Sequence, residues 1–124
     1  MTPYDRMGGE PGIRRFTQRF YALMETLPEA AACRAVHPPN LANAEQRLFE
    51  YLSGWLGGPS LYIARHGRPM LRRRHLHAPI GAEEVRGWLI CFHRAWEEQI
   101  MDTELGNEVL PQIEKLAHHM QNCG

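Results

Sequence analysis

The sequence has few of the features that mark secreted, disulfide-bonded or membrane-spanning proteins. Its three cysteines, Cys33, Cys91 and Cys123, are an odd number and form no C-x-x-C pair, which argues against a disulfide framework and a thiolate zinc site. No apolar run approaches the roughly 20 residues that cross a bilayer, and the chain does not open with a cationic stretch followed by an apolar one. We therefore expect a protein of a reducing compartment, the cytoplasm.

An excess of charge of either sign is also lacking. The 124 residues carry 14 basic and 14 acidic side chains, so the formal net charge is +0, which argues against a nucleic-acid binder driven by bulk charge. Lysine is nearly absent: Lys115 is the only one, and the other basic residues are arginines, whose planar guanidinium suits carboxylates and phosphates. Hydrophobic residues make up 44% and charged residues 23%, as in a soluble globular protein, and we expect one domain over residues 1–124.

Apolar and polar residues do not alternate as they do in strands, and no internal repeat or low-complexity tract is present. Apolar side chains instead recur at helical spacings of three and four. The segments with this pattern are, approximately, residues 10–27, 44–55, 82–101 and 105–120. Residues 60–81 are rich in Gly and Pro and predict at most a short helix that ends near His75. The sequence thus predicts an all-α domain of four main helices plus short ones.

The irregular stretch contains an unusual mixture of cations and imidazoles. Arg72, Arg73 and Arg74 directly precede His75, and His77 follows two residues later. Three interpretations fit this local pattern: a solvated basic turn, a His-x-His zinc pair, or a single histidine on a haem iron with arginines at the haem propionates. The zinc interpretation lacks third and fourth ligands at a recognisable spacing. A nucleic-acid site would need interleaved aromatics or a wider basic face.

Three side chains with an apolar body and a polar tip lie near the expected helices. Tyr21 lies on or beside the buried face of the first helix, Trp88 lies about one turn into the third main helix, and His37 precedes Pro38. A buried phenol or indole needs a hydrogen-bond partner. Ordinary core packing explains each of them singly, whereas their convergence on one cleft would form a polar pocket.

Six blocks of the sequence resemble the group II truncated haemoglobins and occur in the order of that family. They are residues 7–10, 19–23, 41–48, 55–62, 72–75 with 79–81, and 87–89. The most specific part is Gly-Gly-Pro-x-x-Tyr at residues 57–62, followed by Leu-x-x-Arg-His at residues 71–75 and then by Trp88. The resemblance implies a truncated globin, a two-on-two helical sandwich that holds haem b.

The resemblance also implies roles for single residues. His75 matches the proximal ligand of the haem iron, and His77 then has no part in ligation. Tyr21, Trp88 and His37 match the distal positions, from which they would donate hydrogen bonds to the ligand on the iron.

Other positions would form the walls of the site. Ala44 and Leu48 match the distal helix, which then offers a small residue at the entry and no polar group. The expected apolar walls of the haem are Phe20, Tyr51, Leu52, Leu71, Ile80, Leu89 and Phe92. The residues expected at the propionates are Arg72, Arg74 and Tyr62.

The function implied is that of a haem protein that reversibly binds dioxygen, carbon monoxide and nitric oxide, for oxygen storage or for detoxification of nitric oxide and peroxide. Donors around a bound ligand with partial negative charge slow its release, which argues against simple transport. One alternative is a peroxidase-like enzyme or a nitric oxide dioxygenase. Because the chain has no G-x-G-x-x-G motif, the dioxygenase would need a separate reductase. Another alternative is a haem-free helical module that recognises an anionic partner or zinc. We expect a monomer or homodimer, with neither nucleic acid nor membrane as a partner.

Overall fold

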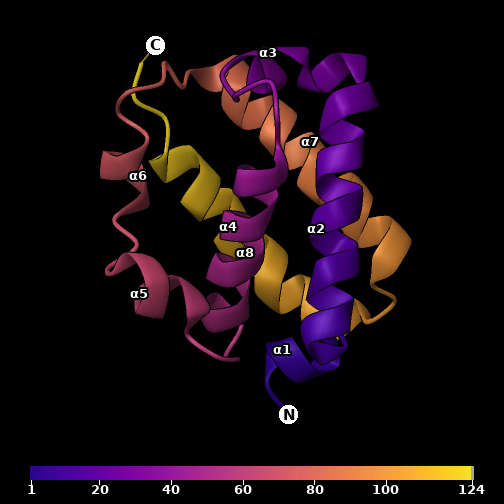
Figure 1. Cartoon of the computed structure of the whole chain (residues 1–124). Coiled ribbons are helices and arrows are strands. Elements are labelled where there is room, and N and C mark those ends of the chain that lie inside the picture. The colour runs from indigo at the N-terminus through magenta and orange to yellow at the C-terminus, as the bar shows by residue number, and fades with distance from the viewer. Residues whose placement is uncertain (124) are drawn as a thin grey trace.

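The computed structural model describes residues 1–123, which fold into helices joined by short loops (Figure 1). The four long helices are α2 (Gly9–Thr26), α4 (Ala42–Trp55), α7 (Ala82–Gln99) and α8 (Thr103–His119). The short ones are α1 (Pro3–Arg6), η1 (Pro28–Ala30), α3 (Ala31–Ala35), α5 (Leu61–His66) and α6 (Leu71–Arg74). The described residues contain no strand, and the prediction of four main helices plus short ones is confirmed.

Helix α2 lies at the centre of the core because its apolar stripe is completely buried. Phe16 and Phe20 are fully inaccessible to solvent, and α2 packs mainly against α7 and also against α4. The Phe16 ring meets the Phe92 ring of α7 edge to face, with centroids 4.8 Å apart. Edge-to-face pairs stabilise beyond the area that they bury, so this contact fixes the angle between α2 and α7 as well as holding them together.

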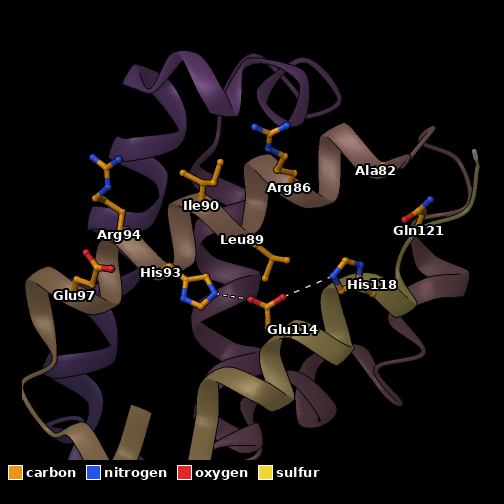
Figure 2. A pocket seen from close by; sticks show the side chains of 10 residues that line it. All are labelled: Ala82, Arg86, Leu89, Ile90, His93, Arg94, Glu97, Glu114, His118 and Gln121. Atoms are coloured by element: carbon orange, nitrogen blue, oxygen red, sulfur yellow. Dashed lines mark hydrogen bonds and ion pairs between the residues drawn. The ribbon is translucent and has the colours of Figure 1, made fainter. Parts of the chain in front are cut away.

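A polar contact joins α7 to α8 at the surface. Figure 2 shows the His93 ring of α7 pointing at the Glu114 carboxylate of α8, with His118 on the other side of that carboxylate. The His93 Nε2 to Glu114 Oε1 distance is 2.7 Å, and the His118 Nε2 to Glu114 Oε2 distance is 3.7 Å. These side chains line a hollow of about 540 Å³ between the two helices.

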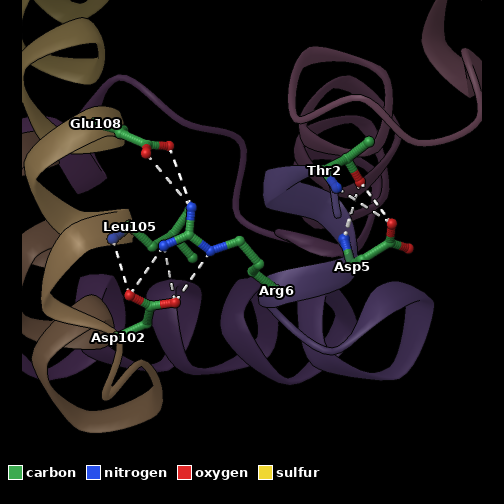
Figure 3. Close-up of polar contacts among 6 residues, drawn as sticks. All are labelled: Thr2, Asp5, Arg6, Asp102, Leu105 and Glu108. Atoms are coloured by element: carbon green, nitrogen blue, oxygen red, sulfur yellow. Dashed lines mark hydrogen bonds and ion pairs between the residues drawn. The ribbon is translucent and has the colours of Figure 1, made fainter.

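The start of α8 is tied to the N-terminal helix (Figure 3). Arg6 donates from Nε and Nη2 to the two carboxylate oxygens of Asp102, both at 3.1 Å, and its Nη1 lies 3.4 Å from Glu108. Asp102 also accepts from the Leu105 N–H at 3.0 Å and so caps α8. This cluster fixes where α8 begins, and hence where its C-terminal end lies.

The segment between α4 and α7 is packed differently from the rest. Helix α5 contacts α4, whereas α6 makes extensive contact with no other helix among the described residues. Residues 71–80 must therefore be held in place largely by polar contacts, because α6 is too short to bury a broad apolar stripe.

None of the helices in residues 1–123 combines the length and the apolar character required to cross a membrane.

Candidate functional site

His75 is the residue that ends α6, and its ring is held in one orientation. Its Nδ1 lies 2.7 Å from the Leu71 carbonyl oxygen, so Nδ1–H donates one helical turn back. A neutral imidazole that donates from Nδ1 presents a lone pair on Nε2, which is the form that binds a metal ion. His75 is half-buried, so this nitrogen is not sealed in the core.

The backbone around His75 is held by Asn122, a residue that sequence reasoning missed. The Asn122 Nδ2 donates to the carbonyls of His75 at 3.3 Å and Ala78 at 3.0 Å, while its Oδ1 accepts from the Ile80 N–H at 2.9 Å. The Asn122 backbone N–H donates to the Ile80 carbonyl at 2.8 Å. The C-terminal tail thus fastens residues 75–80 without any apolar contact that a periodic pattern would reveal.

Arg74, expected at a haem propionate, is engaged within its own loop. Its guanidinium donates to the carbonyls of His66 at 2.6 Å, Pro69 at 2.8 Å and Arg68 at 3.0 Å. It also lies 5.6 Å from the Tyr62 ring centre. Arg74 therefore closes the loop between α5 and α6 with Nε and Nη2, and only Nη1 makes no hydrogen bond within residues 1–123 and would remain for a propionate.

A buried carboxylate anchors the far end of α5. Glu50 of α4 is only 4% exposed; its two oxygens meet His66 Nε2 at 3.0 Å and Arg65 Nη1 at 3.3 Å. Gln46 donates to the same carboxylate at 3.2 Å. Burial by itself raises the pKa of Glu50, but these hydrogen bonds and the Arg65 charge outweigh it, so the pKa lies below its ordinary value.

The three expected distal residues are brought together around Phe20. The Phe20 ring lies 4.8 Å from the Tyr21 ring and 5.3 Å from the Trp88 ring, and the Tyr21 and His37 rings are 6.0 Å apart. Tyr21 comes from α2, Trp88 from α7, and His37 from the loop that follows α3. These contacts connect the three residues through neighbouring rings, in the order Trp88, Phe20, Tyr21 and His37.

Two of these residues carry donors that no described residue satisfies. Within residues 1–123 neither the Tyr21 hydroxyl nor the Trp88 Nε1–H has a hydrogen-bond partner, and yet no fully enclosed polar side-chain atom is unpaired. Each donor must therefore open onto accessible space rather than into the closed core. Burial of the ring raises the pKa of Tyr21, which keeps its hydroxyl protonated as a donor.

His37, beside the Tyr21 ring, differs from Tyr21 and Trp88 in its hydrogen bonding. Its Nδ1–H donates to the Cys33 carbonyl at 2.8 Å. Burial lowers the pKa of His37, and the nearby charges of Arg34 and His75 lower it further, so the ring is neutral near pH 7. Its Nε2 then carries a lone pair that can accept a hydrogen bond, whereas the resemblance implies a donor.

The expected apolar wall residues fall into two groups. Phe20, Leu52, Leu89, Phe92 and Tyr62 are buried, while Ala44, Leu48, Tyr51, Leu71 and Ile80 are half-buried. The buried group packs within the protein core, and the half-buried group has apolar surface left for a planar ligand. Arg72 is exposed, and no ion pair or hydrogen bond engages its side chain within residues 1–123.

The residues fit a haem held by one histidine. One oriented imidazole with a lone pair on Nε2, two unpartnered donors and half-buried apolar walls match what haem ligation requires. A zinc pair of His75 and His77 fits less well: His77 is exposed, and within the described residues no group of three His, Cys, Asp or Glu side chains is arranged to hold a metal ion.

Comparison with known proteins gives the family. The model of the bacterial-like globins matches residues 2–122, and the chain belongs to that family. The group II 2-on-2 haemoglobin of Agrobacterium tumefaciens is 51% identical, with a TM-score of 0.96 over 98% of this chain and 95% of that one. The cold-adapted truncated haemoglobin of Pseudoalteromonas haloplanktis is 37% identical, with a TM-score of 0.96 over 100% of both chains. The truncated oxygen-avid haemoglobin of Bacillus subtilis is 31% identical, with a TM-score of 0.88 over 98% of this chain and 100% of that one.

Family membership gives the general function. The cofactor of a globin is haem, and its function is to bind diatomic ligands such as oxygen at the haem iron. The predicted two-on-two globin fold is confirmed. The alternative interpretation as a haem-free helical module is not supported by this family membership.

Proposed function

We propose that His75 is the proximal ligand of haem b, and that Tyr21 and Trp88 hold a diatomic ligand by hydrogen bonds on the opposite face. One arrangement carries this proposal: the His75 ring is fixed by its 2.7 Å bond to the Leu71 carbonyl, and the Tyr21 hydroxyl and the Trp88 Nε1–H have no partner within residues 1–123. When bound, haem would supply an iron atom that His75 would hold and that would bind a small ligand.

The two donors favour a ligand that gains negative charge on binding. The Tyr21 hydroxyl and the Trp88 Nε1–H are neutral donors in an apolar surrounding, where a hydrogen bond to a charged acceptor is stronger than in water. His37 accepts at neutral pH, and its Nε2 can orient the Tyr21 hydroxyl or a water molecule. Ala44 and Leu48 add no polar group. Dioxygen, which polarises strongly on binding, would therefore leave slowly, in line with the description of the Bacillus subtilis relative as oxygen-avid.

The rim of the site would hold the haem propionates. Arg72 is exposed and has no partner within residues 1–123, so its guanidinium is available for a carboxylate. Tyr62 lies under Arg74 and 5.9 Å from Tyr51, where the two rings meet edge to face. These aromatic rings would support the haem edge, with Arg72 as the main charged contact.

The test compares two neighbouring histidines by visible absorption of the reduced protein before and after addition of carbon monoxide. We expect His75→Ala to lose or alter the haem spectrum and its shift with carbon monoxide. His77→Ala, which removes an exposed imidazole two residues away, should behave as the wild type. A spectrum that changes in His77→Ala but not in His75→Ala would contradict the proposed ligand.

A further inference from the structure

The zero net charge of the chain hides a strong internal asymmetry. Residues 51–82 contain no Asp or Glu, and they carry five arginines: Arg65, Arg68, Arg72, Arg73 and Arg74. The rest of the chain therefore has all 14 acidic residues and 14 − 5 = 9 basic ones. Residues 51–82 therefore carry a net charge of about +5, and the rest of the chain carries about −5. Such a separation of charge orients a protein toward a charged partner during encounter.

The same stretch exposes apolar side chains. Ile63 is 54% exposed, Met70 50% and Leu76 55%, although large apolar residues gain by burial. Met70, Leu71 and Leu76 line a hollow of about 300 Å³ whose other lining residues are Arg72, Arg73 and His119 of α8. A hollow with an apolar floor and a cationic rim is suited to a partner side chain flanked by carboxylates.

Two exposed arginines lie in or next to this hollow: Arg73 lines it, and Arg68 precedes Met70, another lining residue, by two positions. Within residues 1–123 no ion pair or hydrogen bond engages the side chains of Arg68 and Arg73, both of which are exposed. We call Arg68, Met70, Arg73 and Leu76 the α6 surface.

We propose that the α6 surface docks an acidic electron-carrier protein, of the flavin or iron–sulfur class, that reduces the haem by one electron. The carrier loses one electron, and ferric iron gains it and becomes ferrous, the state that binds dioxygen. The chain has no G-x-G-x-x-G motif to bind its own reductant, and the α6 surface is formed by Arg73 of α6 and by residues just before and after this helix, whose C-cap is His75, the proposed haem ligand. The proposal rests on the proposed role of His75.

A second arginine pair supplies a matched control. Arg86 and Arg94 line the hollow between α7 and α8, where Glu97 and Glu114 balance their charge (Figure 2). That hollow has no excess of one sign, so charge complementarity does not predict an acidic partner there.

The experiment uses the haem-loaded protein with an acidic flavodoxin as the probe. Calorimetry measures the Kd in 20 mM and 300 mM NaCl, and anaerobic stopped-flow measures reduction of ferric haem by reduced flavodoxin. We expect Arg68→Gln/Arg73→Gln to weaken binding roughly tenfold or more and to flatten the salt dependence, since charges at the rim of an interface act on association. Arg86→Gln/Arg94→Gln should match the wild type, and Leu76→Ser should weaken the binding that remains at high salt.

Three results would overturn the proposal: no salt-sensitive binding of flavodoxin, equal losses in both arginine pairs, or arginine-dependent binding to anionic phosphatidylglycerol vesicles in place of flavodoxin. The carbon monoxide spectrum of each variant separates this failure from failure of the haem site. It should stay unchanged in both arginine pairs, whatever their binding, while His75→Ala changes it.

The hydrogen bonds of Asn122 support a second inference, which also rests on the proposed role of His75. We infer that Asn122 is a positioning residue that sets the height and tilt of the His75 ring relative to the haem. Its side chain makes three hydrogen bonds to the backbone at His75, Ala78 and Ile80. Among the described residues α6 makes no extensive contact with another helix that could hold this backbone in place of Asn122. Asn122, in the C-terminal tail, therefore determines where the backbone of residues 75–80 lies.

The test uses Asn122→Ala, Asn122→Asp and, as control, Gln121→Ala. The readouts are the iron–histidine stretching mode of the ferrous protein, by resonance Raman, and the rate of haem loss to an excess of apomyoglobin. We expect Asn122→Ala to shift that mode and to speed haem loss several-fold. Asn122→Asp keeps the acceptor for Ile80 but loses both donors, and should lie between. A lower Tm of the apoprotein with an unshifted mode would show a merely structural role.

Discussion

The two faces of the site are built by different means. The proposed distal donors lie on long helices, and their rings pack against Phe20: the Phe20 ring centroid lies 4.8 Å from that of Tyr21 and 5.3 Å from that of Trp88. His75, the proposed proximal ligand, lies at the end of a four-residue helix held by hydrogen bonds from Arg74 and Asn122. Buried packing on one side and exposed polar contacts on the other imply unequal local stability.

This difference indicates which side of the proposed site can change its conformation more easily. A close-packed aromatic cluster fixes donor positions to a fraction of an ångström, because moving one ring moves its neighbours. A segment held by a few solvent-accessible hydrogen bonds opens at a much smaller free energy. We therefore expect ligand selection to reside in the distal face, and haem entry and exit to occur through the proximal one.

The largest effect on stability is expected from the aromatic core. Phe92→Ala removes a fully buried ring that contacts Phe16, Phe20 and Trp88, and should lower the free energy of unfolding by about 3–5 kcal/mol. Urea denaturation followed by circular dichroism measures it. Leu76→Ala, on the exposed proximal side, should change it by less than about 0.5 kcal/mol. Similar losses in the two variants would remove the contrast between the faces.

A large functional effect with little loss of stability is expected at Tyr21. Tyr21→Phe removes one donor and keeps the ring that packs on Phe20, so the loss is one hydrogen bond to a charged acceptor, about 1.5–3 kcal/mol. Dioxygen should leave roughly 10- to 100-fold faster, as measured by stopped-flow displacement with carbon monoxide. Tyr4→Phe, at a half-buried phenol of α1 outside the proposed site, serves as the control. An unchanged rate in Tyr21→Phe would refute the distal assignment.

An intermediate, pH-dependent effect is expected at Glu50, which joins the two regions. Since its folded pKa lies below the ordinary value, its ionised form stabilises the fold above the unfolded pKa, and that stabilisation is lost as the pH falls through the folded pKa. Glu50→Gln should cost about 1–2 kcal/mol at pH 7, and the gap to the wild type should close below about pH 4. Thermal unfolding between pH 3 and pH 7 tests this. A gap that is constant with pH would mean that the charge has no role.

The smallest effect is expected from Arg74. Arg74→Ala frees the carbonyls of His66, Arg68 and Pro69 and should lower the local opening free energy of residues 66–76 by about 1 kcal/mol, with little change in global unfolding. Amide hydrogen exchange with peptide resolution measures it, and the exposed Arg73→Ala is the control. Equal protection in the two variants would show that the guanidinium does not close the loop.

The long helices could be predicted from the sequence because burial imposes a period. Residues 10–27 and 82–101 show apolar spacings of three and four, and α2 and α7 begin and end within two residues of the predicted bounds. The convergence of Tyr21, Trp88 and His37 was implied only by the family resemblance, since separate helices carry them.

The proximal contacts could not be predicted in this way. Arg74 and Asn122 bind backbone carbonyls, which every residue offers, so no residue type at the far end signals the pairing. The tautomer of His37 was missed for a similar reason: the Cys33 carbonyl at 2.8 Å decides which ring nitrogen holds the proton. Contacts between side chains and loop backbone become visible only when the fold is known.

The Asn122 clamp also bears on the order in which the molecule is made. During synthesis the chain emerges from its N-terminus onward, so the helices that carry Tyr21 and Trp88 leave the ribosome well before Asn122 does. His75 is bonded to a residue 47 positions later. With His75 as the proposed haem ligand, we expect stable capture of haem only after residue 122 has left the ribosome.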